Sequence, residues 1–201
     1  MIRVLIAEDQ AMVRGALASL LALEGDLEVV AQVARGDEVL PAARDAAPDV
    51  ALLDIEMPGG DGLSAAAQLA GALPDLRVVI LTTFGRPGYL RRAMESGARG
   101  FVLKDAPATE LASAIRRVMD GERVLDPALA AAALAEGESP LTPRETEVLG
   151  AARGGEPVVD LAGRLHLSSG TVRNYLSSAM QKLGAHSRAE AVRVAEDKGW
   201  L

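Results

Sequence analysis

The chain has 201 residues, of which 49% are hydrophobic, so it can form one or two domains with substantial cores. It has no cysteine and only two histidines, which excludes disulfides and thiolate metal sites and leaves too few ligands for a histidine-rich zinc site. No apolar stretch is long enough to span a membrane and no signal peptide is visible, so we expect a cytoplasmic protein without membrane insertion.

The net charge of −7 is distributed unevenly along the chain. Residues 1–139 carry 13 basic and 21 acidic side chains, whereas residues 140–201 carry 8 basic and 7 acidic ones. A uniform negative charge would argue against nucleic-acid binding. Because the balance changes sign near residue 139, nucleic-acid binding stays open for the C-terminal part.

In the first 121 residues, short apolar runs alternate with segments of helical periodicity. The apolar runs, which we expect to form strands, lie at 2–7, 27–33, 50–53, 77–81 and 100–103. The helical segments lie at 10–23, 36–46, 61–73, 86–95 and 107–119. This alternation predicts a doubly wound α/β domain, in which a five-stranded parallel sheet is covered by helices on both faces.

Polar side chains stand where four of these runs end. They are Glu8 and Asp9 after the first run, Asp54 after the third, Thr82 after the fourth and Lys104 after the fifth. The carboxyl ends of parallel strands meet at one edge of the sheet, where ligands bind. Clustered carboxylates repel each other unless a cation lies between them, and all-oxygen ligands favour Mg²⁺. The pattern therefore predicts a magnesium site, although Asp54 taken alone could equally be a turn or helix-capping residue.

No P-loop and no Gly-x-Gly-x-x-Gly motif follows a strand, so the pattern does not favour nucleotide binding of a familiar kind. An acidic pair, an Asp-x-x-Met-Pro-x-x-Asp-Gly motif, a threonine and a lysine occur in this order at Glu8-Asp9, residues 54–62, Thr82 and Lys104. In these features residues 1–121 resemble the receiver domain of bacterial two-component response regulators. The resemblance implies a flavodoxin-like fold.

The resemblance also implies a role for each strand-end residue. Asp54 would be the phosphoacceptor, which takes a phosphoryl group from a sensor histidine kinase. Asp9 and Asp54 would bind Mg²⁺ directly with the backbone carbonyl of Glu56 as a third ligand, and Glu8 would act through metal-bound water. Lys104 would pair with a phosphate oxygen.

Thr82 and Phe101 would be the switch residues of such a receiver. Thr82 would move to hydrogen-bond the phosphoryl group, and Phe101 would turn inward as Thr82 shifts. Phe101 can equally be an ordinary core residue, and Thr83 is expected to be a bystander. Phosphorylation adds about −1.5 to −2 charges, which is enough to rearrange an acidic loop.

Residues 122–139 have the composition of a linker, with an alanine-rich stretch that predicts a short helix before a polar end. Residues 140–201 predict a smaller all-α domain. Its first helix begins at a capping box, with Thr142 as N-cap, Pro143 at the first helical position and Glu145 at the third. Two further helices, 157–165 and 169–183, are joined by a tight turn, and the second is free of acidic residues. This pattern fits a helix-turn-helix unit, although a four-helix protein-binding bundle would show a similar one.

Four short motifs favour the DNA-binding alternative. They are Leu-Thr-Pro-Arg-Glu at 141–145, Leu-Ala at 161–162, Gly-Thr-Val-Arg-Asn at 170–174 and Lys-Leu-Gly at 182–184. With these motifs the C-terminal region resembles the LuxR-type DNA-binding domain. A receiver followed by this domain is the arrangement of the NarL/FixJ class, and the stretches 171–177 and 198–201 resemble the subgroup that regulates membrane-lipid desaturation. One departure is Glu156–Val159, where the family usually has small polar and basic residues.

The helix at 169–183 is the expected recognition helix. Val172, Leu176 and Met180 recur at helical spacing and should face the core, which turns three other side chains outward into the major groove: Arg173, Asn174 and Ser177. Thr171 and Lys182 are expected to contact phosphates, which position the protein without specifying sequence.

We expect a homodimer on activation, through the first and last helices of the receiver. The residues expected at this interface are Met12, Leu23, Ala112 and Met119, which lie outside the apolar stripes of their helices and could also be peripheral packing.

Taken together, these patterns predict a phosphorylation-activated DNA-binding transcriptional regulator of a two-component system, which is not an enzyme beyond promoting its own aspartyl phosphorylation and dephosphorylation. One alternative is a phosphoaspartyl hydrolase, but such hydrolases carry a second Asp two residues after the nucleophile, where this chain has Glu56. Another is a phosphorylation-independent regulator whose receiver only dimerises.

Overall fold

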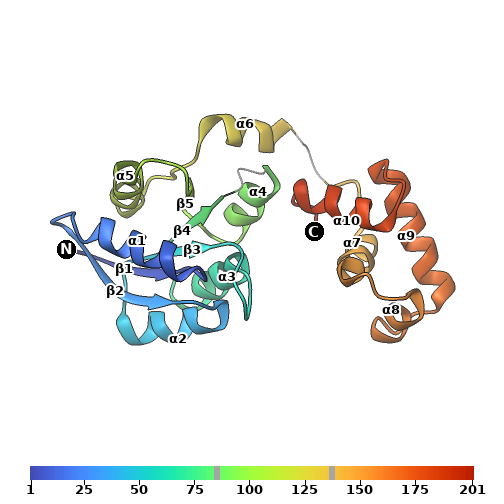
Figure 1. Ribbon diagram of the computed structural model, residues 1–201. Coiled ribbons are helices and arrows are strands. Elements are labelled where there is room, and N and C mark those ends of the chain that lie inside the picture. The colour runs from blue at the N-terminus through green and yellow to red at the C-terminus, as the bar shows by residue number, and fades with distance from the viewer. Residues whose placement is uncertain (84–86, 136–138) are drawn as a thin grey trace. The chain divides into compact units, whose positions relative to one another are not determined.

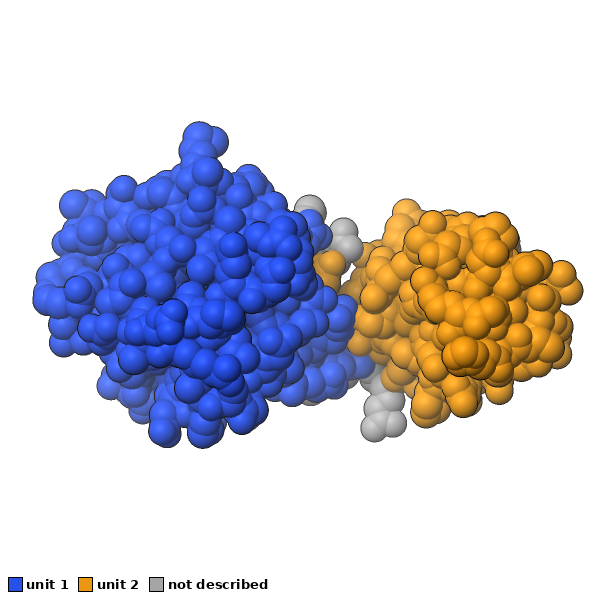
Figure 2. All heavy atoms as spheres, turned by 90° about the horizontal axis from the view of Figure 1, so that it is seen from below, with its two compact units in different colours: residues 1–85, 90–130 blue, residues 86–89, 131–201 orange. Residues whose placement is uncertain are grey.

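The computed structural model describes residues 1–83, 87–135 and 139–201. The chain divides into two compact units, which Figure 2 shows in different colours: residues 1–85 with 90–130, and residues 86–89 with 131–201. The expected start of a helix at residue 86 and the polar stretch at 136–138 lie outside the described residues. Among helices of the described ranges, none is long and apolar enough to cross a membrane.

Unit 1 contains the predicted five-stranded parallel sheet. Its strands are β1 (Ile2–Ala7), β2 (Leu27–Val33), β3 (Val50–Asp54), β4 (Arg77–Thr82) and β5 (Gly100–Leu103). They are ordered β2-β1-β3-β4-β5, and every neighbouring pair is parallel. The central strand β3 is buried along its whole length, which explains its uninterrupted apolar sequence. The strand order reverses at β1, so the ends of β1 and β3 form the switch point where doubly wound folds bind ligands.

Helices cover both faces of the sheet, with α1 and α5 on one and α2 and α3 on the other (Figure 1). The helices within residues 1–121 are α1 (Ala11–Leu21), α2 (Gly36–Ala46), α3 (Gly62–Ala72), α4 (Pro87–Glu95) and α5 (Ala108–Met119). On the face of α1 and α5, their apolar side chains pack on Val4, Val50 and Val79 of the sheet. α3 begins at Asp61, whose carboxylate accepts a hydrogen bond from the backbone N–H of Ser64 at 2.6 Å.

After α5 the chain returns to the edge of the sheet. Val124 forms a parallel bridge with Gly100: its N–H donates to the carbonyl of Arg99 at 2.9 Å, and its carbonyl accepts from the N–H of Phe101 at 2.8 Å. The first residues of the expected linker therefore remain attached to β5. The alanine-rich stretch then forms α6 (Pro127–Ala135), as its composition predicts.

Unit 2 is built from helices, as expected. They are α7 (Pro143–Ala151), the 3₁₀ turn η1 (Ala152–Gly154), α8 (Val158–Arg164), α9 (Ser169–Leu183) and α10 (Arg188–Asp197). The predicted capping box is present, since Thr142 and Glu145 exchange side-chain to backbone hydrogen bonds. One apolar core joins all four α-helices, and its most buried members include Val148, Leu161, Val172, Ala179 and Ala191.

Candidate functional site

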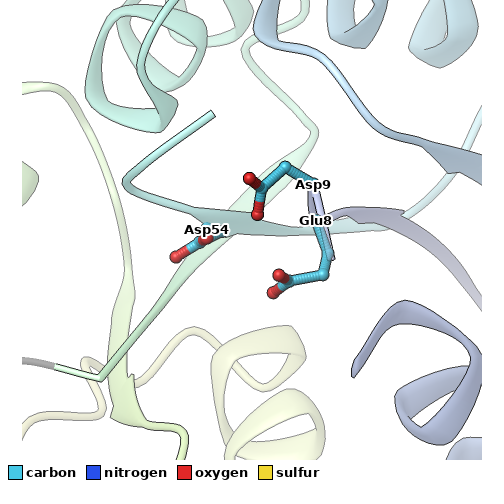
Figure 3. A group of neighbouring side chains, drawn as sticks. All are labelled: Glu8, Asp9 and Asp54. Carbon is cyan, nitrogen blue, oxygen red and sulfur yellow. The ribbon is translucent and has the colours of Figure 1, made fainter. Parts of the chain in front are cut away.

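The sheet brings the predicted strand-end residues together at the C-terminal ends of β1, β3, β4 and β5. The carboxylates of Glu8, Asp9 and Asp54 each offer an oxygen within 4.8 Å of the other two. Figure 3 shows Glu8 and Asp9 extending from the end of β1 beside Asp54 at the end of β3. The register explains this meeting, because Ala7 pairs with Leu53, so the next residues of both strands leave the sheet at the same level.

Lys104 bridges the two buried members of this acidic group. Its ammonium lies 2.6 Å from Oε2 of Glu8 and 3.0 Å from Oδ2 of Asp54. Asp54 is 6% exposed and Glu8 is buried still more deeply, whereas Asp9 is exposed. One positive charge therefore faces two carboxylates that water scarcely reaches.

The pKa values of these groups reflect their burial. Burial raises the pKa of the Asp54 carboxyl, against the opposing hydrogen bond and charge of Lys104. Burial likewise raises the pKa of Glu8, and the nearby charge of Asp54 adds to the effect. For Lys104, burial lowers the pKa, but hydrogen bonds to Glu8 and Asp54 outweigh it and the net pKa is raised. The ammonium of Lys104 therefore stays charged, whereas burial makes ionisation of the two carboxyl groups less favourable.

The loop after β3 fixes the orientation of Asp54. Its Oδ1 accepts a hydrogen bond from the N–H of Ile55 at 2.8 Å, and the N–H of Gly62 closes the loop on the carbonyl of Ile55 at 2.9 Å. A Cβ at Gly62 would collide with the backbone carbonyl of Asp54, so the Asp-Gly end of the motif is required for this close approach.

These residues surround a cleft of about 80 Å³, lined by Asp9, Gln10, Asp54, Glu56, Thr82, Thr83 and Lys104. Thr82 is buried at the end of β4, and its carbonyl accepts a hydrogen bond from the N–H of Lys104 at 2.8 Å. Thr83 is exposed. The cleft is therefore lined by every residue that the sequence assigned to phosphoryl chemistry except Glu8. The carboxylate of Glu8 contacts the ammonium of Lys104, which does line the cleft.

The donors fit a hard divalent cation. All side-chain candidates are carboxylate oxygens, the preferred ligands of Mg²⁺. Oε2 of Glu8 is buried, and among the described residues its polar partner is the ammonium of Lys104 at ion-pair distance. A cation bound at the cleft would stabilise the ionised form of this carboxylate.

Phe101 lies on β5 with 2% of its surface exposed. It lies in the interior in this conformation, and an inward turn of Phe101 as Thr82 shifts stays a prediction. This position suits both interpretations made from the sequence, the ordinary core residue and the inward arrangement of a switch residue.

The second predicted site lies on α9. Val172 and Leu176 are buried in the core of unit 2, and Met180 packs against it. Arg173, Asn174 and Ser177 are exposed, as the helical period requires. The helix begins at Ser168, whose side chain caps the N–H of Thr171 at 3.0 Å. α8 and α9 with their four-residue turn form the predicted helix-turn-helix unit.

Comparisons with known proteins identify both units. Residues 4–116 match the response regulator receiver domain family, and residues 139–195 match the luxR family of bacterial regulatory proteins. The chain belongs to the response regulators of the NarL/FixJ class. Response regulators of this class are not enzymes in the conventional sense, which excludes the phosphoaspartyl hydrolase. The match of residues 139–195 to the luxR family favours the DNA-binding domain over the protein-binding bundle.

Relatives of this response regulator match it from end to end. It is 48% identical to the uncharacterized transcriptional regulatory protein YvfU and 46% identical to the transcriptional regulatory protein DesR, both of Bacillus subtilis (strain 168), over 201 residues and 100% of each chain. A solved structure of two RcsB dimers bound to two parallel DNAs matches with a TM-score of 0.68 at 25% identity, over 98% of both chains.

Two polar residues that the sequence assigned to phosphate contacts are engaged within the response regulator itself. The hydroxyl of Thr171 lies 2.8 Å from that of Ser168, within the cap of α9. The ammonium of Lys182 donates to Oε2 of Glu145 at 2.7 Å. The sequence revealed the capping role of Glu145 but not this second contact, because nothing in the spacing of residues 145 and 182 indicates that α7 and α9 meet there.

Two arginines in and beside the helix-turn-helix region, Arg164 and Arg188, are also partnered. Arg188 donates to the carbonyls of Glu156 at 2.6 Å and Gly155 at 2.7 Å, and Arg164 donates to the carbonyl of Ala151 and to Glu156. Both arginines fasten the loop before α8. In the stretch that departs from the family pattern, Val159 is an exposed apolar residue.

The residues expected at a dimer interface separate into two groups. Met12, in the first turn of α1, and Leu23, in the turn that follows the helix, are 84% and 82% exposed. Ala112 is 1% exposed in the receiver core, so its side chain is not on the surface, contrary to expectation. Met119 is partly buried against the same core. α5 buries a wider stripe than one helical face requires, because Leu111, Ala112, Ala114, Ile115 and Val118 are all covered.

Proposed function

We propose that this response regulator accepts a phosphoryl group on Asp54 from a sensor histidine kinase in the cytoplasm, and that the modification activates its binding to DNA. The observation that carries the proposal is the cleft, in which Asp54 lies 3.0 Å from the ammonium of Lys104 and beside the acidic pair Glu8-Asp9. A carboxylate held in this way has a cation ready for the charge that phosphorylation adds.

In the proposed transfer, an oxygen of Asp54 forms a bond to phosphorus while the P–N bond of the kinase phosphohistidine breaks. The electron pair of that bond leaves with the imidazole nitrogen. Lys104 then pairs with a phosphoryl oxygen, and the hydroxyl of Thr82 donates to another. Phe101 is buried on β5, the strand that pairs with β4, and it forms the proposed switch together with Thr82.

Mg²⁺ would supply charge neutralisation at the phosphoryl oxygens. Asp9, Asp54 and the backbone carbonyl of Glu56 are the proposed direct ligands, and Glu8 acts through a metal-bound water. The all-oxygen donor set and the poorly satisfied Oε2 of Glu8 support this assignment.

We further propose that the functional division is receiver 1–121, linker 122–139 and DNA-binding domain 140–201, which the family matches at 4–116 and 139–195 support. In the DNA-binding domain, Arg173, Asn174 and Ser177 would read bases from the exposed face of α9. Thr171 would contact a phosphate near the start of that helix.

Activation is proposed to act through a homodimer. α1 carries no charged residue on its exposed face, where Met12 stands with the small residues Gly15, Ala16 and Ser19, and the exposed Leu23 follows in the turn after the helix. An apolar helix face of this kind is costly to leave in water. The dimeric state of RcsB on DNA supports a second copy as the occupant.

Chemical phosphorylation tests the assignment of Asp54. Wild type incubated with acetyl phosphate and a magnesium salt should gain one phosphoryl group per chain, as measured by intact-mass spectrometry. Asp54→Ala should gain none, and Asp75→Asn, an exposed carboxylate before β4, should behave as wild type. Labelling of the Ala variant at the wild-type level would refute the site. If phosphorylated and unmodified wild type bind DNA equally, the phosphorylation-independent regulator is correct instead.

A further inference from the structure

A buried carboxylate outside the phosphoacceptor cleft joins α7 to the proposed recognition helix. Glu145 is 4% exposed, whereas the other buried carboxylates of the described residues, Glu8 and Asp54, belong to the cleft. Its Oε1 accepts from the hydroxyl of Ser178 at 2.6 Å. Its Oε2 accepts from the N–H of Thr142 and from the ammonium of Lys182, both at 2.7 Å.

These contacts do more than cap a helix. The capping box needs only Thr142, which lies on the same side of α7 as Glu145. Ser178 and Lys182 stand four residues apart on α9 and therefore share one face, a helical turn apart along its axis. One side chain in the first turn of α7 thus holds α9 at two points and restrains both its distance and its tilt.

The held segment adjoins the residues that are proposed to read bases. Ser178 follows Ser177 directly, and Arg173 and Asn174 lie one turn further toward the N-terminus of α9. Bidentate contacts between side chains and base edges have strict geometry, so a small tilt of the helix misplaces them. The carboxylate of Glu145 also binds the ammonium of Lys182, which would otherwise be available to contact a DNA phosphate.

We propose that Glu145 is a positioning residue for DNA reading: it fixes α9 on α7 through Ser178 and Lys182 and keeps the Lys182 charge on the protein. This inference rests on the proposed reading of bases by α9. The hydrogen bonds from Lys182, Ser178 and Thr142 lower the pKa of Glu145 to about 2, so its carboxylate stays ionised at neutral pH.

The chain offers a matched control two residues away. Glu147 also stands on α7, but it pairs with Arg144 of the same helix at 2.6 Å, and both side chains are about half exposed. Glu145→Gln and Glu147→Gln each remove one negative charge from the same helix. Any long-range effect of charge on DNA binding is therefore nearly equal in the two variants.

The test uses the full chain activated with beryllofluoride and Mg²⁺, and DNA that wild type selects from a random-sequence pool. Fluorescence anisotropy gives the ratio of affinities for selected and unselected DNA. Glu145→Gln should lower this ratio at least about tenfold, while Glu147→Gln leaves it as in wild type. Equal ratios in the two variants would overturn the proposal. If wild type itself enriches no sequence, the reading of bases by this protein fails instead.

Lys182→Met separates positioning from phosphate contact, because it keeps the apolar stem and removes the charge. The selected-to-unselected ratio should fall, whereas the slope of log affinity against log salt concentration should stay unchanged. Combining it with Glu145→Gln should cost little more than either change alone, since the two residues act as one unit. A slope reduced by about 0.9 with an intact ratio would mean that Lys182 contacts a phosphate, and would refute the anchor.

Circular dichroism shows whether Glu145→Gln folds. If it does not, Ser178→Ala carries the test, because it deletes one of the two α9 contacts and leaves the capping box and the ion pair in place. This variant should lower the selected-to-unselected ratio by a smaller factor. A wild-type ratio in Ser178→Ala would then overturn the proposal.

Discussion

The cleft brings together three carboxylates and one ammonium, so its side chains carry a net negative charge when all of them are ionised. Lys104 contacts Glu8 and Asp54, and Asp9 adds a further carboxylate at the rim. If all three acids are ionised, two negative charges remain, which is the charge of one divalent cation. Burial is the main cause of the raised pKa values of Glu8 and Asp54, and repulsion from a neighbouring carboxylate adds to the shift of each.

The imbalance predicts that Mg²⁺ stabilises the receiver and does so more strongly as pH rises. Metal binding requires ionised carboxylates, and raised pKa values let protons compete with the metal to a higher pH than at exposed acids. At a hundred times Kd, Mg²⁺ should add about 2.7 kcal/mol to the free energy of unfolding. Thermal unfolding with and without Mg²⁺ at pH 5 and pH 7.5 measures both effects.

Asp9→Asn should abolish most of this stabilisation, because it removes a proposed metal ligand without disturbing the ion pairs of Lys104. Asp75→Asn removes an equal charge away from the cleft and should retain it. A magnesium effect that survives in Asp9→Asn, or that weakens as pH rises, would contradict the proposed ligand set.

At the scale of single elements, α9 combines a buried and an exposed face in an unbroken helix. Its N-cap at Ser168 and its left-handed C-cap at Gly184 set its length. Between them, Val172, Leu176 and Ala179 anchor one face in the core and leave Arg173 and Asn174 outward. The core packing therefore decides which side chains DNA can meet.

Arg173→Ala should weaken binding to DNA selected by wild type by about 1–3 kcal/mol and relax the base preference at one position of the site. Arg193→Ala, which removes the same charge from the exposed face of α10, should weaken selected and unselected DNA by similar factors. Competition binding with single-base variants of the selected site measures both quantities. A base-preference profile identical to that of wild type would mean that Arg173 does not read a base.

Features set by local periodicity could be predicted from the sequence, and features set by tertiary distances could not. Asp54, Thr82 and Lys104 were assigned to one edge because they follow strands, and parallel strands end together. The contacts of Glu145 with Ser178 and Lys182 depend on the angle between α7 and α9. The spacing of residues along the sequence carries no information about that angle. Ala112 was misplaced because the width of the buried stripe on α5 depends on what packs against it.

For the molecule as a whole, charge limits what one copy can do on DNA. Residues 140–201 carry 8 basic and 7 acidic side chains, and several of the basic ones are held in internal contacts. A single copy can therefore neutralise few phosphates and should bind weakly. A second copy tethered nearby raises the local concentration to about millimolar and the avidity by orders of magnitude. Pairing of receivers is thus an economical way to couple phosphorylation to DNA binding.

If α1 and the turn after it form the dimer interface, a charge placed among their exposed apolar residues should weaken the dimer. Leu23→Glu should weaken the dimer of the beryllofluoride-activated protein at least about 100-fold, because a two-fold interface loses two buried leucines worth about 1.5–3 kcal/mol each. Val159→Glu places the same charge on an exposed apolar position of α8 and should leave the dimer intact. Sedimentation velocity across a concentration series gives both dissociation constants. A dimer of unchanged strength in Leu23→Glu would exclude α1 from the interface, and an activated wild type that stays monomeric would exclude pairing as the signal.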